Sequence, residues 1–166
     1  MNIPSKEECI KILKENNVPD NIIAHTSKVC DFSMKVVDVL EKRGMEVNRQ
    51  LVVAGALLHD LKKLSPNDHV IEGHECVKSK GYPEVAELIK KHGLANLDKE
   101  DFVPKTWEEK IVFYADKRVK NDTVVSVDER FEYIKKRYNY PEIENEKLFT
   151  KNIERELLGD EKIASA

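Results

Sequence analysis

Cysteine is scarce in this sequence, and its three copies lie far apart. Cys9, Cys30 and Cys76 contain no C-x-x-C pair, which excludes a disulfide framework and a thiolate zinc site of the usual spacing. Isolated cysteines of this kind typically stay reduced and pack as small hydrophobic residues. We therefore expect a cytoplasmic protein whose cysteines are free thiols.

Long apolar runs and a strong charge of either sign are also missing. No segment approaches the ~18 apolar residues that a membrane span needs, and the N-terminal MNIPSKEEC lacks the apolar core of a signal peptide. The net charge is only -3, so no overall field draws the protein to nucleic acid. We expect neither a membrane nor a nucleic acid as a partner.

What the sequence does contain is a regular series of helix start and stop signals. Three of them are capping-box patterns, at Ser5-x-x-Glu8, Thr106-x-x-Glu109 and Ser126-x-x-Glu129. The segment Thr123–Val125 favours an extended conformation, but no partner strand is recognisable. With 166 residues, the chain is large enough for one sizeable core. The sequence predicts an all-α fold, a single-domain bundle of about seven or eight helices over residues 1–166.

An imidazole and a carboxylate follow an apolar run that is too hydrophobic to face water. In LVVAGALLHDLKKL, His59 and Asp60 lie near the end of a predicted helix over residues 49–63. Burying either group without a partner costs roughly 2–7 kcal/mol, so hydrogen bonds or a metal ion must satisfy both. Neighbouring residues of a helix diverge by about 100° around its axis. The pair therefore binds one ion only if other helices supply further ligands.

Three more polar residues are predicted to point into the core. His25, His92 and Asp116 each lie three or four positions from apolar residues of their own helices. Taken singly, a core histidine usually donates to a backbone carbonyl, and an inward aspartate usually pairs with a basic side chain. Taken together, these groups favour one or two divalent cations, which would satisfy all of them at once.

At these positions the sequence resembles the HD superfamily of metal-dependent phosphohydrolases. The matching residues are His25, His59-Asp60 and Asp116, and the flanking segments ALLHDLKK, HVIEGHECVKSKGYPEVAELIKKHG and EEKIVFYADKRV are also similar. The resemblance covers roughly residues 20–138, and residues 139–166 have no counterpart. It implies a helical bundle of the HD-domain type followed by a C-terminal helical extension.

The resemblance also implies a ligand set and a reaction. A first metal ion would have four ligands: His25, His59, Asp60 and Asp116. A second ion would share Asp60 and be completed by His69 and His92. The implied cofactor is one or two divalent transition-metal ions, namely Mn, Fe, Co, Ni or Zn. The implied reaction is hydrolysis of a nucleotide or another phosphomonoester by a metal-activated hydroxide, with Asp60 and Lys63 as catalytic residues.

Basic residues beside the ligands are candidates for binding the substrate phosphate. Lys63 follows the His-Asp pair, and Lys117 and Arg118 directly follow Asp116. For Lys117 and Arg118, a solvated helix surface or an ion pair is an equal alternative. The expected partner is a small phosphorylated molecule that is nucleotide-like, and a homodimer is left open.

Two features depart from a simple match. His74 stands where the family usually has a small residue, and its place on the helix favours an exposed or hydrogen-bonded side chain. Residues 93–105, with Phe102 and Pro104, form the longest irregular stretch and are a candidate lid, although a plain surface connection is the alternative.

Three other functions remain open on the sequence alone. Related HD-like domains use similar ligands as diiron oxygenases, which activate oxygen. A non-catalytic module would bind a nucleotide or metal without turnover. A plain helical bundle would hold its histidines by hydrogen bonds and bind no metal. The sequence has no Walker-type glycine loop, which argues against a triphosphate held by backbone amides.

Overall fold

The computed structural model describes residues 1–139 and 142–165. Within these residues the chain forms eight α-helices: α1 Lys6–Glu15, α2 Asp20–Lys42, α3 Arg49–Leu58, α4 His69–Ser79, α5 Pro83–Lys90, α6 Trp107–Asp116, α7 Val127–Arg137 and α8 Glu144–Leu158. A short 3-10 helix spans Glu100–Phe102, and a two-stranded hairpin joins β1 (Val119–Lys120) to β2 (Thr123–Val124). The all-α prediction is confirmed for the described part of the chain.

Polar side chains fix where several helices begin. Ser5, Asn48, Asp68, Thr106 and Ser126 each accept a hydrogen bond from a backbone N–H in the first turn of the helix that follows. At α6 the capping box is reciprocal, since the Glu109 side chain also accepts from the backbone of Thr106. These caps satisfy backbone donors that would otherwise lack partners, and those at Ser5, Thr106 and Ser126 were expected from the capping-box patterns.

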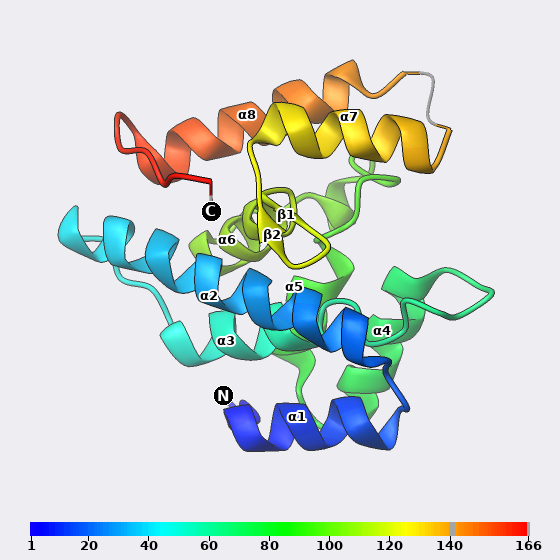
Figure 1. The fold of residues 1–166 in the computed structure, drawn as a ribbon. Helices are drawn as coiled ribbons and strands as arrows, with labels where there is room; N and C mark the ends of the chain where they lie inside the picture. The colour runs from blue at the N-terminus through cyan, green and yellow to red at the C-terminus, as the bar shows by residue number, and fades with distance from the viewer. Residues whose placement is uncertain (140–141, 166) are drawn as a thin grey trace.

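The long helix α2 is the centre of the packing. It contacts α3, α6 and α8 and also the hairpin, and Figure 1 shows it crossing the molecule between α1 on one side and α7 with α8 on the other. Helices α3 and α5 approach closely at Gly55, where an added Cβ would lie 2.5 Å from Leu88 Cδ2. A side chain at position 55 would force the two helices apart. This contact brings the end of α3 toward the end of α5.

Two local predictions need correction. The helix predicted over residues 49–63 ends at Leu58, because the chain then tightens into turns in which Leu61 donates to Leu58 O and Lys63 donates to Asp60 O. The segment Thr123–Val125 does have a partner, since β2 pairs antiparallel with β1. The partner is only two residues long, which is why no alternating pattern marks it in the sequence.

The C-terminal segment packs on the rest of the protein. Helix α8 contacts α2, α6 and α7, and Gly159 ends it with a positive φ of 58°. Pro141, from which the last helix was expected to follow, lies outside the described residues. The division into a core at 20–138 and an extension at 139–166 stays a prediction. No helix among the described residues combines the length and apolarity needed to cross a membrane.

Candidate metal centre

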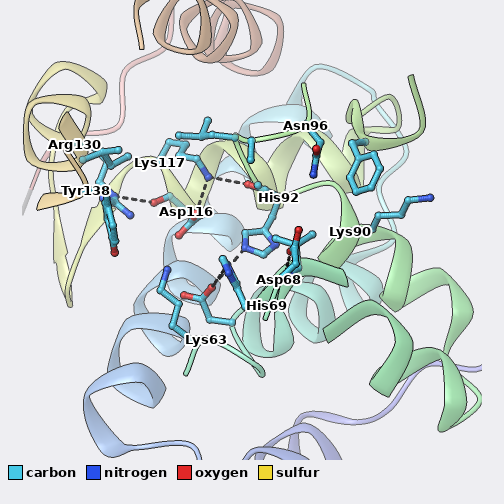
Figure 2. A pocket seen from close by; sticks show the side chains of 17 residues that line it. Lys63, Asp68, His69, Lys90, His92, Asn96, Asp116, Lys117, Arg130 and Tyr138 are labelled. Atoms are coloured by element: carbon cyan, nitrogen blue, oxygen red, sulfur yellow. Dashed lines mark hydrogen bonds and ion pairs between the residues drawn. The ribbon is translucent and has the colours of Figure 1, made fainter. Parts of the chain in front are cut away.

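A pocket of about 320 Å³ lies where the ends of α3, α5 and α6 meet α4 and α7. Figure 2 shows Asp116, Lys117, His92 and His69 near the middle, with Arg130 and Tyr138 to one side of them and Lys90 to the other. We call the central group the inner wall, and it consists of Asp60, His69, His92, Asp116 and Lys117. Five of the other lining residues, which we call the outer wall, are Lys63, Lys90, Phe102, Arg130 and Tyr138.

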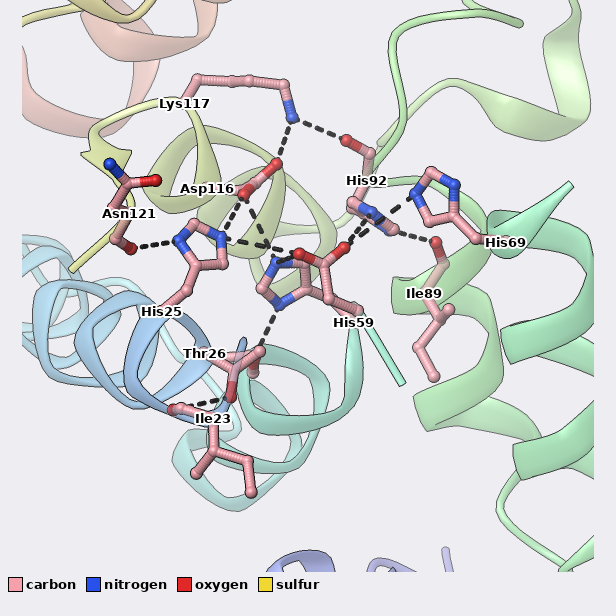
Figure 3. A network of polar contacts seen from close by, with 12 residues as sticks. Ile23, His25, Thr26, His59, His69, Ile89, His92, Asp116, Lys117 and Asn121 are labelled. Carbon is pink, nitrogen blue, oxygen red and sulfur yellow. Dashed lines mark hydrogen bonds and ion pairs between the residues drawn. The ribbon is translucent and has the colours of Figure 1, made fainter. Parts of the chain in front are cut away.

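Three histidines, His92 of the inner wall and His25 and His59 behind it, are oriented in the same way (Figure 3). The Nδ1 atoms of His25, His59 and His92 lie 2.6, 2.7 and 2.6 Å from the backbone carbonyl oxygens of Asn121, Ala56 and Ile89. Because a carbonyl only accepts, each Nδ1 must carry the proton and donate it. The neutral ring then has a bare Nε2 atom directed away from the backbone, as in metal-ligating histidines.

The bare nitrogens face buried carboxylates. Nε2 of His25 lies 3.0 Å from Asp116 Oδ1, and Nε2 of His59 lies 3.3 Å from the same oxygen. His59 is fully buried, and within the described residues its Nε2 has no hydrogen-bond partner of acceptable geometry. A nitrogen lone pair and a carboxylate repel each other unless a proton or a metal cation lies between them. The donors therefore fit a divalent ion, since imidazole and carboxylate are its common protein ligands.

Asp60 connects two ligand groups through its two oxygens. Oδ2 lies 3.6 Å from His25 Nε2 and 3.5 Å from His59 Nε2. Oδ1 lies 3.5 Å from His92 Nε2 and 3.9 Å from His69 Nε2. The first ligand group is His25, His59, Asp60 and Asp116, and the second is Asp60, His69 and His92. Within each group the ligand atoms all lie within 4.8 Å of one another, and Asp60 belongs to both groups. A regular helix would direct the side chains of the neighbours His59 and Asp60 apart. Both residues lie in the turn after α3, which allows them to point at the same site.

Asp116 is held in place by the lysine that follows it. Lys117 Nζ donates to Asp116 Oδ2 at 2.6 Å and to the backbone oxygen of His92 at 2.8 Å. This contact occupies one carboxylate oxygen and leaves Oδ1 directed at His25 and His59. The lysine thus joins the end of α6 to the end of α5 and orients a ligand.

Burial and charge set the protonation of these groups. Burial and the neighbouring His92 lower the pKa of His69 to about 4, and burial lowers the pKa of His92 as well. Both rings are therefore neutral near pH 7 and able to coordinate. Burial opposes ionisation of Asp60, but the nearby His59 and His92 hold its pKa well below the ordinary value. Burial likewise opposes a charged His59, yet Asp60 and Asp116 raise the pKa of His59. In the absence of a metal cation, a proton on His59 offsets the negative charge of the Asp60 and Asp116 carboxylates.

Two other candidates lie away from the ligand groups. The expectation that Arg118 binds phosphate is corrected, because it is buried outside the pocket. Its guanidinium donates to three oxygens, Val125 O, Tyr114 Oη and Ile163 O. His74 is buried too, and its Nδ1 lies 3.0 Å from Ala86 O, in line with the hydrogen-bonded alternative.

The sequence reasoning missed Arg130 and Tyr138, which line the pocket from α7 and the residue after it. Their proximity depends on the β1–β2 hairpin, which reverses the chain after α6 and places α7 beside the pocket. The candidate lid contributes Leu94, Asn96 and Phe102 to the lining. The capping box at Ser126 predicted α7 itself, but only a recognised hairpin would have predicted its position beside the pocket, and the two-residue strands give no such signal.

Comparison with known proteins shows which family this chain is similar to. The model of the HD domain family matches residues 22–120. A tRNA (cytidine(56)-2'-O)-methyltransferase of Picrophilus torridus is 35% identical over 138 residues, which cover 75% of this chain and 39% of that protein. This chain thus spans about two-fifths of the length of that relative. No solved structure matches the chain.

Two relatives come from Methanocaldococcus jannaschii. An uncharacterized protein is 30% identical over 152 residues, which cover 82% of this chain and 89% of the relative. A dihydroneopterin 2',3'-cyclic phosphate phosphodiesterase is 51% identical over 43 residues, or 25% of this chain and 17% of that enzyme. The family model covers more than half of the chain, including His25, the His59-Asp60 pair and Asp116. This protein therefore belongs to the HD domain family.

Proposed function

We propose that this protein is a metal-dependent phosphohydrolase that cleaves the phosphate ester of a small molecule. One observation carries the proposal. Three buried imidazoles donate their Nδ1 protons to backbone carbonyls, so their Nε2 atoms face the carboxylates of Asp60 and Asp116 beside an open pocket. A cation satisfies this arrangement, and the pocket gives a substrate access to it.

The residues divide into two sets of ligands. One ion would be held by His25, His59, Asp60 and Asp116, and a second by Asp60, His69 and His92. The donor types favour Mn, Fe, Co, Ni or Zn. Bound ions of this kind lower the pKa of a water ligand toward neutrality and stabilise negative charge on phosphoryl oxygens.

The protein's own groups orient and shield the reaction. The carbonyl acceptors fix the three imidazole rings, and Lys117 fixes Asp116. Lys63 lines the pocket just beyond the ligand pair, where its ammonium group holds a phosphate oxygen. Asp60, His92, Asp116 and Lys117 of the inner wall are buried, which limits access of bulk water and strengthens electrostatic interactions with the substrate.

The pocket supports a substrate of nucleotide size. A cavity of about 320 Å³ lies at the lower end of the usual range for small-molecule sites, which is roughly 300–1,000 Å³. Aromatic side chains, among them Phe102 and Tyr138, line the same pocket and suit a ring system. The similarity to the cyclic phosphate phosphodiesterase supports a phosphate ester. We do not extend methyl transfer to this chain, because it covers only 39% of the methyltransferase.

The test is a hydrolysis screen of protein purified without chelator. Phosphate release from nucleoside monophosphates and p-nitrophenyl phosphate is measured with Mn, Co, Mg or Ni added. Asp60→Asn should lower the rate by at least about 100-fold, because it removes a shared ligand. Asp31→Asn, an exposed aspartate on α2, is the matched control and should retain full activity. Oxygen consumption with no phosphate release would reject hydrolysis and favour the oxygenase alternative.

A further inference from the structure

The outer wall carries cationic side chains that form no ion pair among the described residues. Lys63 and Arg130 both line the pocket, and neither makes an ion pair within 4.0 Å among the described residues. Lys117, which faces them from the inner wall, is already paired with Asp116. Lys91, one residue from Lys90, is likewise paired with Glu109. Lys90, the third cation of the outer wall, also has no ion pair among the described residues, and its Nζ lies 5.2 Å from the centre of the Phe102 ring.

Arg130 is less satisfied than Lys63. Its Nε donates to Asp116 O at 3.4 Å, a long hydrogen bond, as Figure 2 shows. Its Nη1 is buried and has no partner among the described residues. A guanidinium has five N–H donors, and leaving them unpaired in a partly buried site is costly. Arg118, only twelve positions earlier, shows the alternative, because each of its three nitrogens donates to an oxygen.

The position of Arg130 relates it to the chemistry of the inner wall. Its hydrogen bond to the backbone of Asp116 fixes the guanidinium beside a metal-ligand residue. Ile134 lies one helical turn after Arg130 on α7, Tyr138 directly follows the helix, and both line the cavity together with Arg130. A ligand bound at the Asp60 and Asp116 carboxylates would therefore occupy the same cavity as Arg130.

We propose that Arg130, together with Lys63, binds the anionic oxygens of a phosphate monoester and selects it over a phosphate diester. The proposal rests on the hydrolytic function above. A monoester carries two negative charges near pH 7 and three non-bridging oxygens, whereas a diester carries one charge and two. Where the monoester presents its third charged oxygen, the diester presents a second ester group, whose bridging oxygen is a weaker, uncharged acceptor for a guanidinium.

The first test compares a monoester with a diester on the metal-loaded protein. With Mn present, Arg130→Met should raise KM for p-nitrophenyl phosphate by about 10- to 100-fold, the usual effect of losing a hydrogen bond to a charged group. Its kcat/KM for bis(p-nitrophenyl) phosphate should change less than about threefold, and Arg130→Lys should recover part of the loss. Equal losses for both esters would overturn the proposal.

A matched control addresses overall charge. Lys136→Met removes one positive charge from an exposed position on α7. It should leave the hydrolysis of both esters unaffected. A loss of activity equal to that of Arg130→Met would show that the overall positive charge, and not a direct contact of Arg130 with the phosphate, causes the effect.

A binding measurement separates this proposal from the proposed function. Calorimetry with inorganic phosphate on the Mn-loaded protein should show affinity at least tenfold lower for Arg130→Met than for the original chain. If the original chain hydrolyses neither ester but shows this difference, the phosphohydrolase function fails and the anion site stands. If phosphate binds equally to both proteins, the anion site fails whatever the activity.

Discussion

The two walls of the pocket differ in how completely their polar groups are satisfied. On the inner wall, Lys117 pairs with Asp116 and His92 donates to a backbone carbonyl, so these three side chains are held by the protein itself. On the outer wall, Lys63 and Arg130 have no acidic partner among the described residues, and Tyr138 is 48% exposed. The inner wall is preorganised to bind metal ions, whereas the cations of the outer wall are free to bind an anionic ligand.

This difference indicates where reaction and specificity reside. Metal ligands need fixed geometry, which explains why carbonyls and Lys117 hold them on all sides. Substrate-binding groups need free donors, and a donor that already has a protein partner gains little from a ligand. Satisfaction of hydrogen bonds thus distinguishes Arg130 from Arg118 more clearly than their sequence surroundings do.

The largest effect on stability is expected for Arg118→Met. The change removes three hydrogen bonds from a buried guanidinium and leaves their acceptors unpaired. The free energy of unfolding should fall by about 3–5 kcal/mol, measured by urea denaturation. KM for p-nitrophenyl phosphate, measured below the unfolding transition, should not change. A raised KM with normal stability would show that Arg118 binds the substrate.

His69→Ala sharpens the comparison within the ligand groups. It removes a ligand from the second group only, so the metal content should fall from two ions per chain to one. Affinity for the second ion should drop by at least about 100-fold, measured by titration. His74→Ala is the control, because it removes a buried histidine that belongs to neither group. Equal metal content in all three proteins would contradict the two-ion proposal.

Lys117→Met should weaken metal binding without removing a ligand. Loss of the contact to Asp116 Oδ2 frees that carboxylate to rotate, and affinity for the first ion should fall by about 10- to 100-fold. Lys91→Met is the matched control, since Lys91 also pairs with a buried acid, Glu109, outside both ligand groups. If both variants bind metal as the original chain does, Lys117 does not orient Asp116.

The smallest effect is expected in the segment 93–105. If it is a lid, phosphate and Mn together should slow its backbone hydrogen exchange by about three- to tenfold, as local opening becomes rarer. Residues 43–48, between α2 and α3, serve as the internal reference and should be unaffected. Unchanged exchange in 93–105 would make it a plain surface connection.

The sequence predicted local features and the family well. Caps such as Ser5 and Thr106 depend on residues within one turn, so their signals are complete in the sequence. The resemblance to the HD family supplied His25, the His59-Asp60 pair and Asp116, and that membership is confirmed by the match over residues 22–120. The roles of these residues as metal ligands stay predictions that the geometry supports.

Features that arise from tertiary contacts could not be predicted from the sequence. Arg118 and Arg130 are both basic residues near Asp116, and only the course of the hairpin places one in the core and the other at the pocket. The end of α3 at Leu58 depends on tight turns that no proline or glycine marks. Such features follow from packing, which pattern and propensity do not encode.

The most direct test of the metal centre is elemental analysis of protein purified without chelator. The account predicts two divalent ions per chain in the original protein and a loss of both in Asp60→Asn, with Asp31→Asn unchanged. Because Asp60 contributes one oxygen to each ligand group, its loss affects both sites. A protein that holds no stoichiometric metal after purification in metal-containing buffer would contradict the account.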